Sequence, residues 1–317
     1  MRIRFRRVKD VTIRPAHWLV RAGTLLPEWL QRPYFKSFGL LGKAYYFTPY
    51  NHARRTVRNF CRMTGRSDSQ QVYFQIVDNI LFAASAFGRL MSDGTDAVAE
   101  LVTFDEPSVA RTEAVRAKYG AGIMLVPHCA ASVLAAAGFG RRFPTLVLVR
   151  ESRSMSRQLL MRRYFDKLGP ELLFVRHTDP AVVARAILRA LHEKKFVIGT
   201  TDLARETADT VKVEFFGQTV PLPGWPARFS ARRKIPILPG YVRVSGGRIV
   251  LSCDEPYIEP DVAAATQRWA RYFEKSIRES PADWVFMLDK HWSSVIAKAA
   301  SAQRHSPKGA AALRAPV

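Results

Sequence analysis

One histidine stands where an α/β protein places reacting groups. His128 directly follows the apolar run Gly122–Pro127, which is typical of a buried strand. It precedes a stretch of small residues, Cys129–Ala137, that indicates the start of a helix. Open α/β sheets bind their ligands at the carboxyl ends of strands, where a neutral imidazole can take a proton from a substrate hydroxyl. His128 is therefore the candidate general base, and a purely structural histidine is the competing interpretation.

Other reactive side chains are weaker candidates for catalysis or metal binding than His128 is for proton transfer. Cys129 adjoins His128, but neighbouring side chains at a strand-to-helix turn usually point apart, and no second group to orient a thiolate is evident. No phosphate-loop or dinucleotide fingerprint occurs, so we expect no cofactor. We also expect no metal, because the remaining histidines lack the spacing of metal ligands. Four other histidines show no metal-ligand spacing among themselves: His177, His192, His291 and His305.

Two charged residues follow other predicted strands. Arg150 comes directly after Thr145–Val149, and Asp202 follows Phe196–Thr200. A guanidinium fork suits a phosphate or a carboxylate. A carboxylate at the strand end can bind substrate or anchor its own loop. Both residues are candidates for substrate binding.

Two glycine-containing segments complete the candidate site. The block Phe215–Gly217 is expected to shape a pocket with Phe216 and Gly217 rather than to react. The segment Pro223–Pro226, with Gly224 in it, indicates a loop that opens a helix. Backbone N–H groups at such a helix start can face an anion.

Strands alternate with helices from about residue 101. Asp179-Pro180 has the pattern of a helix N-cap followed by a first-turn proline. Alternation of this kind predicts an α/β fold with a mixed, mostly parallel sheet flanked by helices. A hairpin around Ser245–Gly247 accounts for the antiparallel part. The predicted strands are Gly122–Pro127, Thr145–Val149, Leu172–Val175, Phe196–Thr200, Val211–Phe215, Ile235–Val244 and Arg248–Ser252.

The N-terminal part of the chain carries much of its excess positive charge. The 317 residues include 49 Lys and Arg against 27 Asp and Glu, giving a net charge of +22. Much of the excess falls in residues 1–70, where aromatic side chains are interleaved with the cations. This mixture is typical of a membrane interface, and a solvated basic face over a helical core is the alternative. Arg21 and Glu28 interrupt the best candidate for a membrane-spanning stretch.

The chain divides into three zones on these patterns. Residues 1–100 are predicted to form a basic helical layer at a membrane surface. Residues 101–296 are predicted to form the α/β domain, and residues 297–317, rich in Ala, Ser and Pro without periodicity, a mobile tail. A groove is expected to run from His128 past Arg150 and Asp202 toward the apolar N-terminal helices.

The order of motifs resembles the bacterial lipid A biosynthesis late acyltransferases, of the lysophospholipid acyltransferase superfamily. The resemblance covers roughly residues 15–295, and the Phe-Phe-Gly block is its most specific part. The motifs, in chain order, are Leu125-Val126-Pro127-His128, Val147-Leu148-Val149-Arg150, Thr200-Thr201-Asp202, Val213-Glu214-Phe215-Phe216-Gly217, Pro221-Leu222-Pro223-Gly224 and Ile235-Pro236-Ile237-Leu238-Pro239.

The resemblance implies an acyl transfer at the cytoplasmic face of the bacterial inner membrane by a peripheral protein. The donor would be an acyl thioester, usually on acyl carrier protein, and the acceptor a hydroxyl of a lipid or glycolipid. His128 would act as the general base. Arg150, and Arg163 or its neighbour Arg162, would lie near anionic groups of the acceptor.

The sequence departs from this family at one position. The family's histidine is oriented by a carboxylate five residues later, where this chain has Val133. Valine cannot hold the imidazole tautomer or stabilise an imidazolium, and loss of such an acid costs about 10⁴ in rate by analogy with a triad. Ser132 could orient the ring weakly, or a distant acid such as Asp202 or Glu151 could replace the missing one.

Two other functions remain open at this point. A catalytically impaired relative could bind a lipid or an acylated partner without transfer, and Val133 favours that alternative. Binding to nucleic acid would rest on charge alone, because no recognised motif supports it and the cations are mixed with membrane-type aromatics. We therefore expect anionic membrane lipid, rather than nucleic acid, as the partner of the basic surface.

Overall fold

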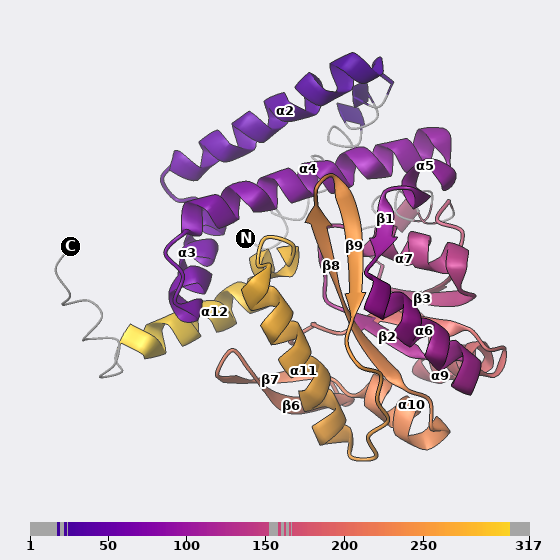
Figure 1. Cartoon of the computed structure of the whole chain (residues 1–317). Coiled ribbons are helices and arrows are strands. Elements are labelled where there is room, and N and C mark those ends of the chain that lie inside the picture. The colour runs from indigo at the N-terminus through magenta and orange to yellow at the C-terminus, as the bar shows by residue number, and fades with distance from the viewer. Residues whose placement is uncertain are drawn as a thin grey trace.

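A seven-stranded mixed sheet forms the centre of the molecule (Figure 1). The computed structural model describes residues 18–19, 22–23, 25–151, 158–159, 162, 165 and 167–304. The strand order is β1-β9-β8-β2-β5-β3-β4, and every neighbouring pair is parallel except β8–β9. The expected mixed, mostly parallel α/β sheet is therefore confirmed. Its strands are β1 (Val102–Phe104), β2 (Ile123–Val126), β3 (Thr145–Val149), β4 (Glu171–Phe174), β5 (Phe196–Thr200), β8 (Ile237–Ser245) and β9 (Arg248–Cys253).

The strand β2 lies inside this sheet between β5 and β8. All four of its residues are buried, which explains why it is a continuous apolar run. The parallel register of β2 and β5 places Val126 opposite Thr200. Residues that follow these two strands therefore emerge side by side at the same edge of the sheet.

A separate hairpin holds the strand that was expected in the main sheet. β6 (Thr210–Phe215) pairs with β7 (Gln218–Pro223) in a two-stranded antiparallel sheet. Phe216 and Gly217 form its turn with φ of 52° and 68°, the left-handed conformation that a tight two-residue hairpin requires. β7 is not predicted from the sequence because its two prolines argue against a strand. β1 is not predicted because three residues carry no periodicity.

Helices form the N-terminal part and cover the sheet (Figure 1). α2 packs along α4, α3 packs against α12 and η2, and α7 contacts β1 and β9. α12 continues to Arg304, so helix extends into the segment for which the sequence predicted a tail, and residues 305–317 lie outside the described part. The helices are α2 (Glu28–Ala44), η1 (Tyr45–Phe47), α3 (His52–Thr64), α4 (Ser69–Asp93), α5 (Asp96–Ala99), α6 (Glu106–Tyr119), α7 (Ser132–Arg142), α9 (Pro180–His192), α10 (Trp225–Arg233), α11 (Val262–Glu279), η2 (Val285–Leu288) and α12 (Lys290–Arg304).

Local signals explain several helix boundaries. The side chain of Asp179 accepts a hydrogen bond from the N–H of Ala181, so the predicted N-cap of α9 is confirmed. Asn51 caps α3 in the same way by accepting from the N–H of Arg54, and Gly65 ends that helix with φ of 74°. Among the helices in the described part of the chain, none combines the length and hydrophobicity needed to cross a bilayer.

A close approach of α7 to β1 gives a test of this packing. A Cβ added to Gly138 would lie 2.6 Å from Cβ of Val102. Ala usually stabilises a helix interior by about 1 kcal/mol relative to Gly, but overpacking costs about 1–3 kcal/mol. We expect Gly138→Ala to lower the free energy of unfolding, measured in urea. Adding Val102→Ala should recover part of the loss, and a more stable single variant would contradict the close packing.

Candidate active site

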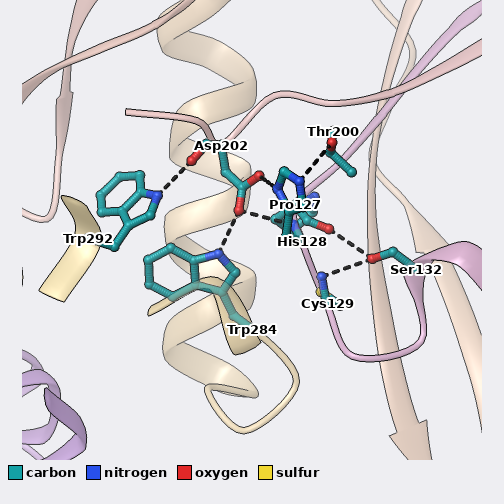
Figure 2. Close-up of polar contacts among 8 residues, drawn as sticks. All are labelled: Pro127, His128, Cys129, Ser132, Thr200, Asp202, Trp284 and Trp292. Carbon is teal, nitrogen blue, oxygen red and sulfur yellow. Dashed lines mark hydrogen bonds and ion pairs between the residues drawn. The ribbon is translucent and has the colours of Figure 1, made fainter. Parts of the chain in front are cut away.

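His128 and Asp202 form a hydrogen-bonded pair at the edge of the sheet (Figure 2). The ring Nδ1 pairs with Oδ1 of Asp202, and the backbone N–H of His128 donates to Oδ2 at 3.0 Å. Each residue lies two positions beyond the registered pair Val126 and Thr200, which is why they meet. Asp202 is 1% exposed, whereas 33% of the His128 side chain is accessible. The carboxylate therefore lies behind the ring and leaves the other side of the ring accessible.

Two buried indoles hold Asp202 in place. Trp284 Nε1 donates to Oδ2 of Asp202 at 2.8 Å, and Trp292 Nε1 donates to the backbone oxygen of Asp202 at 2.6 Å (Figure 2). Both tryptophans are fully buried. Because Oδ2 already accepts from Trp284 and from the backbone of His128, Oδ1 is the oxygen directed at the ring. These contacts fix the orientation of the carboxylate.

The opposite nitrogen of the ring faces Thr200. Nε2 of His128 lies 3.1 Å from Oγ1 of Thr200. The ring of Phe286 stacks on the imidazole with centroids 4.1 Å apart and planes inclined by 22°. A carboxylate only accepts hydrogen bonds, so Nδ1 carries the proton and Nε2 keeps its lone pair. In this tautomer the hydroxyl of Thr200 donates to Nε2.

An apolar cavity of about 160 Å³ adjoins the imidazole. Thr200 and Arg150 also line it, while its walls come mainly from apolar residues of β2, β3, β5 and α7. Val133 is one of these wall residues. The cavity thus lies beside α7, and in the described part of the chain none of its lining residues belongs to the helices before residue 100. The expected direction of the groove, toward those helices, differs from this arrangement.

Of the groups weighed as substitutes for the missing acid, Asp202 is the one that touches the ring. The hydroxyl of Ser132 donates to the backbone oxygen of Pro127 and accepts from the N–H of Cys129, both at 2.9 Å (Figure 2). It therefore shapes the loop rather than the imidazole. Glu151 is 3% exposed and forms an ion pair with Arg162 at 2.8 Å.

The neighbouring thiol is unsuited to nucleophilic attack. Cys129 is buried, and its burial raises the pKa of the thiol well above the ordinary value. The thiolate is the nucleophilic form, so a cysteine in this state is unreactive at neutral pH.

The structure separates the other residues that the sequence proposed for substrate binding. Arg150 is exposed and lines the cavity with His128. Arg163 lies outside the described residues. Phe216 is buried and packs against Phe60 and Trp284, at ring-centroid distances of 5.6 and 6.0 Å. It therefore supports an indole that holds Asp202, one layer away from the cavity.

The two glycines lie apart from the cavity in the described part of the chain. Gly217 is an exposed residue of the β6–β7 turn. Gly224 precedes α10, where a carboxylate of the protein itself occupies the helix start. Oδ2 of Asp209 accepts from the N–H of Trp225 at 2.9 Å, and the backbone oxygen of Asp209 accepts from the N–H of Gly224 at 2.9 Å. The sequence led us to expect an anion at this helix start, and the carboxylate of Asp209 occupies that place.

The segment that carries Trp284 is tied to the loop that carries His128. The backbone oxygen of Asp283 accepts from the N–H of Ala130 at 2.9 Å. Oδ1 of Asp283 accepts from the side chain of Asn79 at 2.8 Å and from the N–H of Val244 at 2.9 Å. Sequence reasoning found neither Trp284 nor Asp283. A signal was present only in the apolar and aromatic character of residues 281–292.

The geometry around His128 is that of a general-base site. A parallel α/β sheet presents an imidazole with a fixed tautomer, a buried carboxylate behind it and an apolar cavity in front. Such a pair can remove a proton from a hydroxyl and stabilise the resulting imidazolium. In the described residues, no group of three or more His, Cys, Asp or Glu side chains is arranged to hold a metal ion.

Comparison with known protein families matches residues 17–294 to the bacterial lipid A biosynthesis acyltransferases. The match covers most of the chain, and the chain belongs to this family. Acyl transfer is therefore the general class of reaction that its family performs. A comparison with curated protein sequences returns no match.

The pair of Asp202 and His128 gives the first prediction for the site. Oδ2 of Asp202 accepts from the N–H of His128 and from Trp284 Nε1. In Asp202→Asn the amide oxygen must take this place, because only an oxygen can accept both hydrogen bonds. The amide NH₂ would then face Nδ1 of His128. The ring proton would then move to Nε2 and remove the base. We expect the rate of acyl transfer to fall by about 10⁴.

Glu151→Gln is the matched control, because Glu151 is also a buried acid beyond a neighbouring strand but pairs with Arg162. It should retain the rate within about tenfold, a loss no larger than that of one ordinary charge-assisted hydrogen bond. Circular dichroism of both variants checks folding. Similar losses in the two variants would contradict the role of Asp202.

Asp283 gives a second prediction, on the pH dependence of stability. Burial raises the pKa of Asp283 to about 6, from an ordinary value of 3.8. Between these values the folded chain keeps a proton that the unfolded chain releases, so the contribution to stability falls as pH rises and levels off above about 6. The full change is about 3 kcal/mol.

Asp283→Asn keeps an oxygen acceptor for Asn79 and Val244 and removes the titration. Relative to this variant, the wild type should lose up to about 3 kcal/mol of unfolding free energy between pH 4 and pH 7.5. Urea unfolding at both pH values measures the difference. A difference that does not change with pH would show that Asp283 ionises normally.

Proposed function

We propose that this chain moves a fatty acyl group from an acyl thioester, carried on acyl carrier protein, to a hydroxyl of a lipid or glycolipid acceptor. The contact between Asp202 and His128, with Nε2 beside an apolar cavity, is the observation that carries this proposal. Family membership supports the reaction class. The reaction would take place at the cytoplasmic face of a bacterial inner membrane, in the manner of lipid A biosynthesis.

The mechanism begins at Nε2 of His128. The acceptor hydroxyl replaces the hydroxyl of Thr200 as the donor to this nitrogen. As the acceptor oxygen bonds to the thioester carbonyl carbon, its proton passes to Nε2. The tetrahedral intermediate then collapses, the carbon–sulfur bond breaks, and the leaving thiolate takes the proton from the imidazolium. Asp202 keeps the correct tautomer at the start and stabilises the positive ring in between.

The cavity and its rim supply substrate contacts in this proposal. The apolar walls, including Val133, accommodate the part of the acyl chain nearest the thioester. Arg150, exposed at the same cavity, is positioned to meet a phosphate or carboxylate of the acceptor. We assign the same kind of contact to Arg163. Asp202 acts through His128 and is a positioning residue rather than a substrate ligand.

The N-terminal layer supports a peripheral membrane location. Large apolar and aromatic side chains on α2 and the following turn are strongly exposed, among them Trp29, Leu41, Phe47 and Tyr50. Together with the basic residues around them they suit the headgroup region of an anionic membrane. Acyl carrier protein, as an acidic donor, would be attracted by the same excess of positive charge.

The alternative function, a relative that binds lipid without transfer, rested on the absence of an acid at position 133. In this proposal Asp202, in the loop after β5, supplies the carboxylate that position 133 lacks. The lining role of Val133 is consistent with an enzyme whose acid comes from elsewhere.

The function is tested by reconstituting transfer. Lipid mass spectrometry of a strain lacking the gene identifies an under-acylated species, which then serves as the acceptor with acyl carrier protein thioesters. We expect the purified wild type to acylate this species and His128→Ala to be slower by about 10³-fold or more, because the base is lost. Equal rates in the two proteins, or an unchanged lipid profile in the strain, would overturn the proposal.

Thr200→Val is the matched variant on the other side of the ring. It removes a hydroxyl that the acceptor replaces, so we expect the rate to stay within about tenfold of wild type. Intact-protein mass spectrometry during turnover should detect no acyl adduct. An acylated wild-type chain, absent from Thr200→Val, would instead make Thr200 a nucleophile.

A further inference from the structure

The outer face of α3 carries a concave cluster of cations that the reaction does not use. Arg54, Arg55, Arg58 and Arg62, here called the arginine pocket, line a depression of about 230 Å³. The amide side chains of Asn51 and Asn59 line it as well, and no acidic side chain is among its lining residues. A concave site of this size with four guanidinium groups matches a compact anion rather than a flat protein surface.

The arginine pocket has no carboxylate partner within the described chain. None of the ion pairs between described residues includes any of its four arginines. Arg54, Arg58 and Arg62 follow one another at four-residue intervals. Like charges at this spacing destabilise a helix by about 0.2–0.5 kcal/mol per pair. An external anion would turn this repulsion into attraction.

Two of the guanidinium groups are held in place by one buried ring. Nη1 of Arg54 donates to the backbone oxygen of Tyr46 at 3.0 Å, and its Cζ lies 5.2 Å from the centre of the Tyr46 ring. Cζ of Arg58 lies 6.0 Å from the same ring centre. Tyr46 is only 5% exposed, so it forms a rigid support. The pocket is thus partly organised before any ligand arrives.

The exposed aromatic residue Tyr50 lines the arginine pocket, and the exposed Phe47 packs against Tyr46, whose ring supports the pocket. Tyr50 is 91% exposed and Phe47 is 65% exposed. Tyr50 also has a positive φ of 64°, a backbone conformation that costs a non-glycine residue about 1 kcal/mol or more and tends to persist at functional sites. Aromatic rings beside cations fit the headgroup level of a membrane.

We infer that the arginine pocket binds the phosphomonoester headgroup of a membrane lipid. Guanidinium forks bind phosphate oxygens in pairs, and a monoester carries more charge than a phosphodiester for four cations to meet. The bordering aromatic residues insert at the depth where such a headgroup lies. This inference rests on the proposed membrane location and is independent of the acyl transfer itself.

The site orients the chain on the bilayer next to the reaction centre. The opposite face of α3 buries Phe60 against Trp284, at a centroid distance of 6.5 Å, and Trp284 holds Asp202. A headgroup in the arginine pocket is therefore one helix diameter from the elements that support the catalytic pair. Lipid binding at this place presents the same side of the protein to the membrane at each encounter.

The test compares vesicles that differ only in headgroup. Flotation is measured with phosphatidylcholine vesicles containing phosphatidic acid or phosphatidylglycerol, adjusted to equal surface potential. We expect the wild type to prefer phosphatidic acid. Arg54→Gln/Arg58→Gln should weaken binding to phosphatidic acid by about tenfold or more and abolish the preference, because two charge-assisted contacts are lost.

Arg232→Gln/Arg233→Gln is the charge-matched control, since these exposed arginines end α10 and lie outside the arginine pocket. It should keep the preference and bind within about twofold of wild type, as expected for distant screened charges. Equal losses in both variants, or a wild type without preference, would overturn the inference. So would a pocket variant that loses only binding to acyl carrier protein.

Acyl transfer measured in detergent separates this inference from the proposed function. Arg54→Gln/Arg58→Gln should retain the wild-type rate there, because neither arginine touches the cavity beside His128. Loss of the preference for phosphatidic acid with intact transfer supports a headgroup site. Circular dichroism checks that the variant is folded.

Discussion

The parallel register between β2 and β5 is the constraint on which the site depends. It sets Val126 beside Thr200, so residues two positions further along each strand meet as imidazole and carboxylate. A carboxylate that is 1% exposed would be very costly without partners. Trp284 and Trp292 supply further donors, and Phe60 packs behind Trp284. The helix α3, the strands β2 and β5 and the C-terminal segment with the two tryptophans therefore all help to hold the buried carboxylate of Asp202.

The carboxylate that contacts His128 comes from the loop after β5, and this leaves α7 to contribute apolar surface. An acid at position 133 would project from α7, where Val133 instead forms part of the apolar cavity wall. Asp202 follows a strand paired on both sides, and two indoles fix it. The carboxylate thus follows β5, while position 133 on α7 contributes to the apolar wall of the cavity.

Sequence reasoning reached the fold and part of the site, for local reasons. Continuous apolar runs identified β2, β3 and β5, because strands buried on both faces leave such runs. His128 and Arg150 were found as polar residues directly after them. Asp202 was one of several possible acids, because choosing it needs the strand order, which depends on contacts far apart in sequence. Trp284 was missed for the same reason, since a buried tryptophan whose indole binds a distant carboxylate looks in sequence like any core residue.

The helix α3 lies between the catalytic pair and the arginine pocket. Its inner face, with Val57, Phe60 and Cys61 buried, packs on the segment that holds Asp202, while its outer face carries the arginine pocket. A rigid helix of 13 residues cannot move one face without the other. In the proposed arrangement, a phosphate bound outside would set how the helix lies on the membrane and would not act on the catalytic pair by its charge, because protein packed around Phe60 and Trp284 separates the two sites. The side of the protein that would face the membrane in the proposed arrangement is in this way the side that supports the acid.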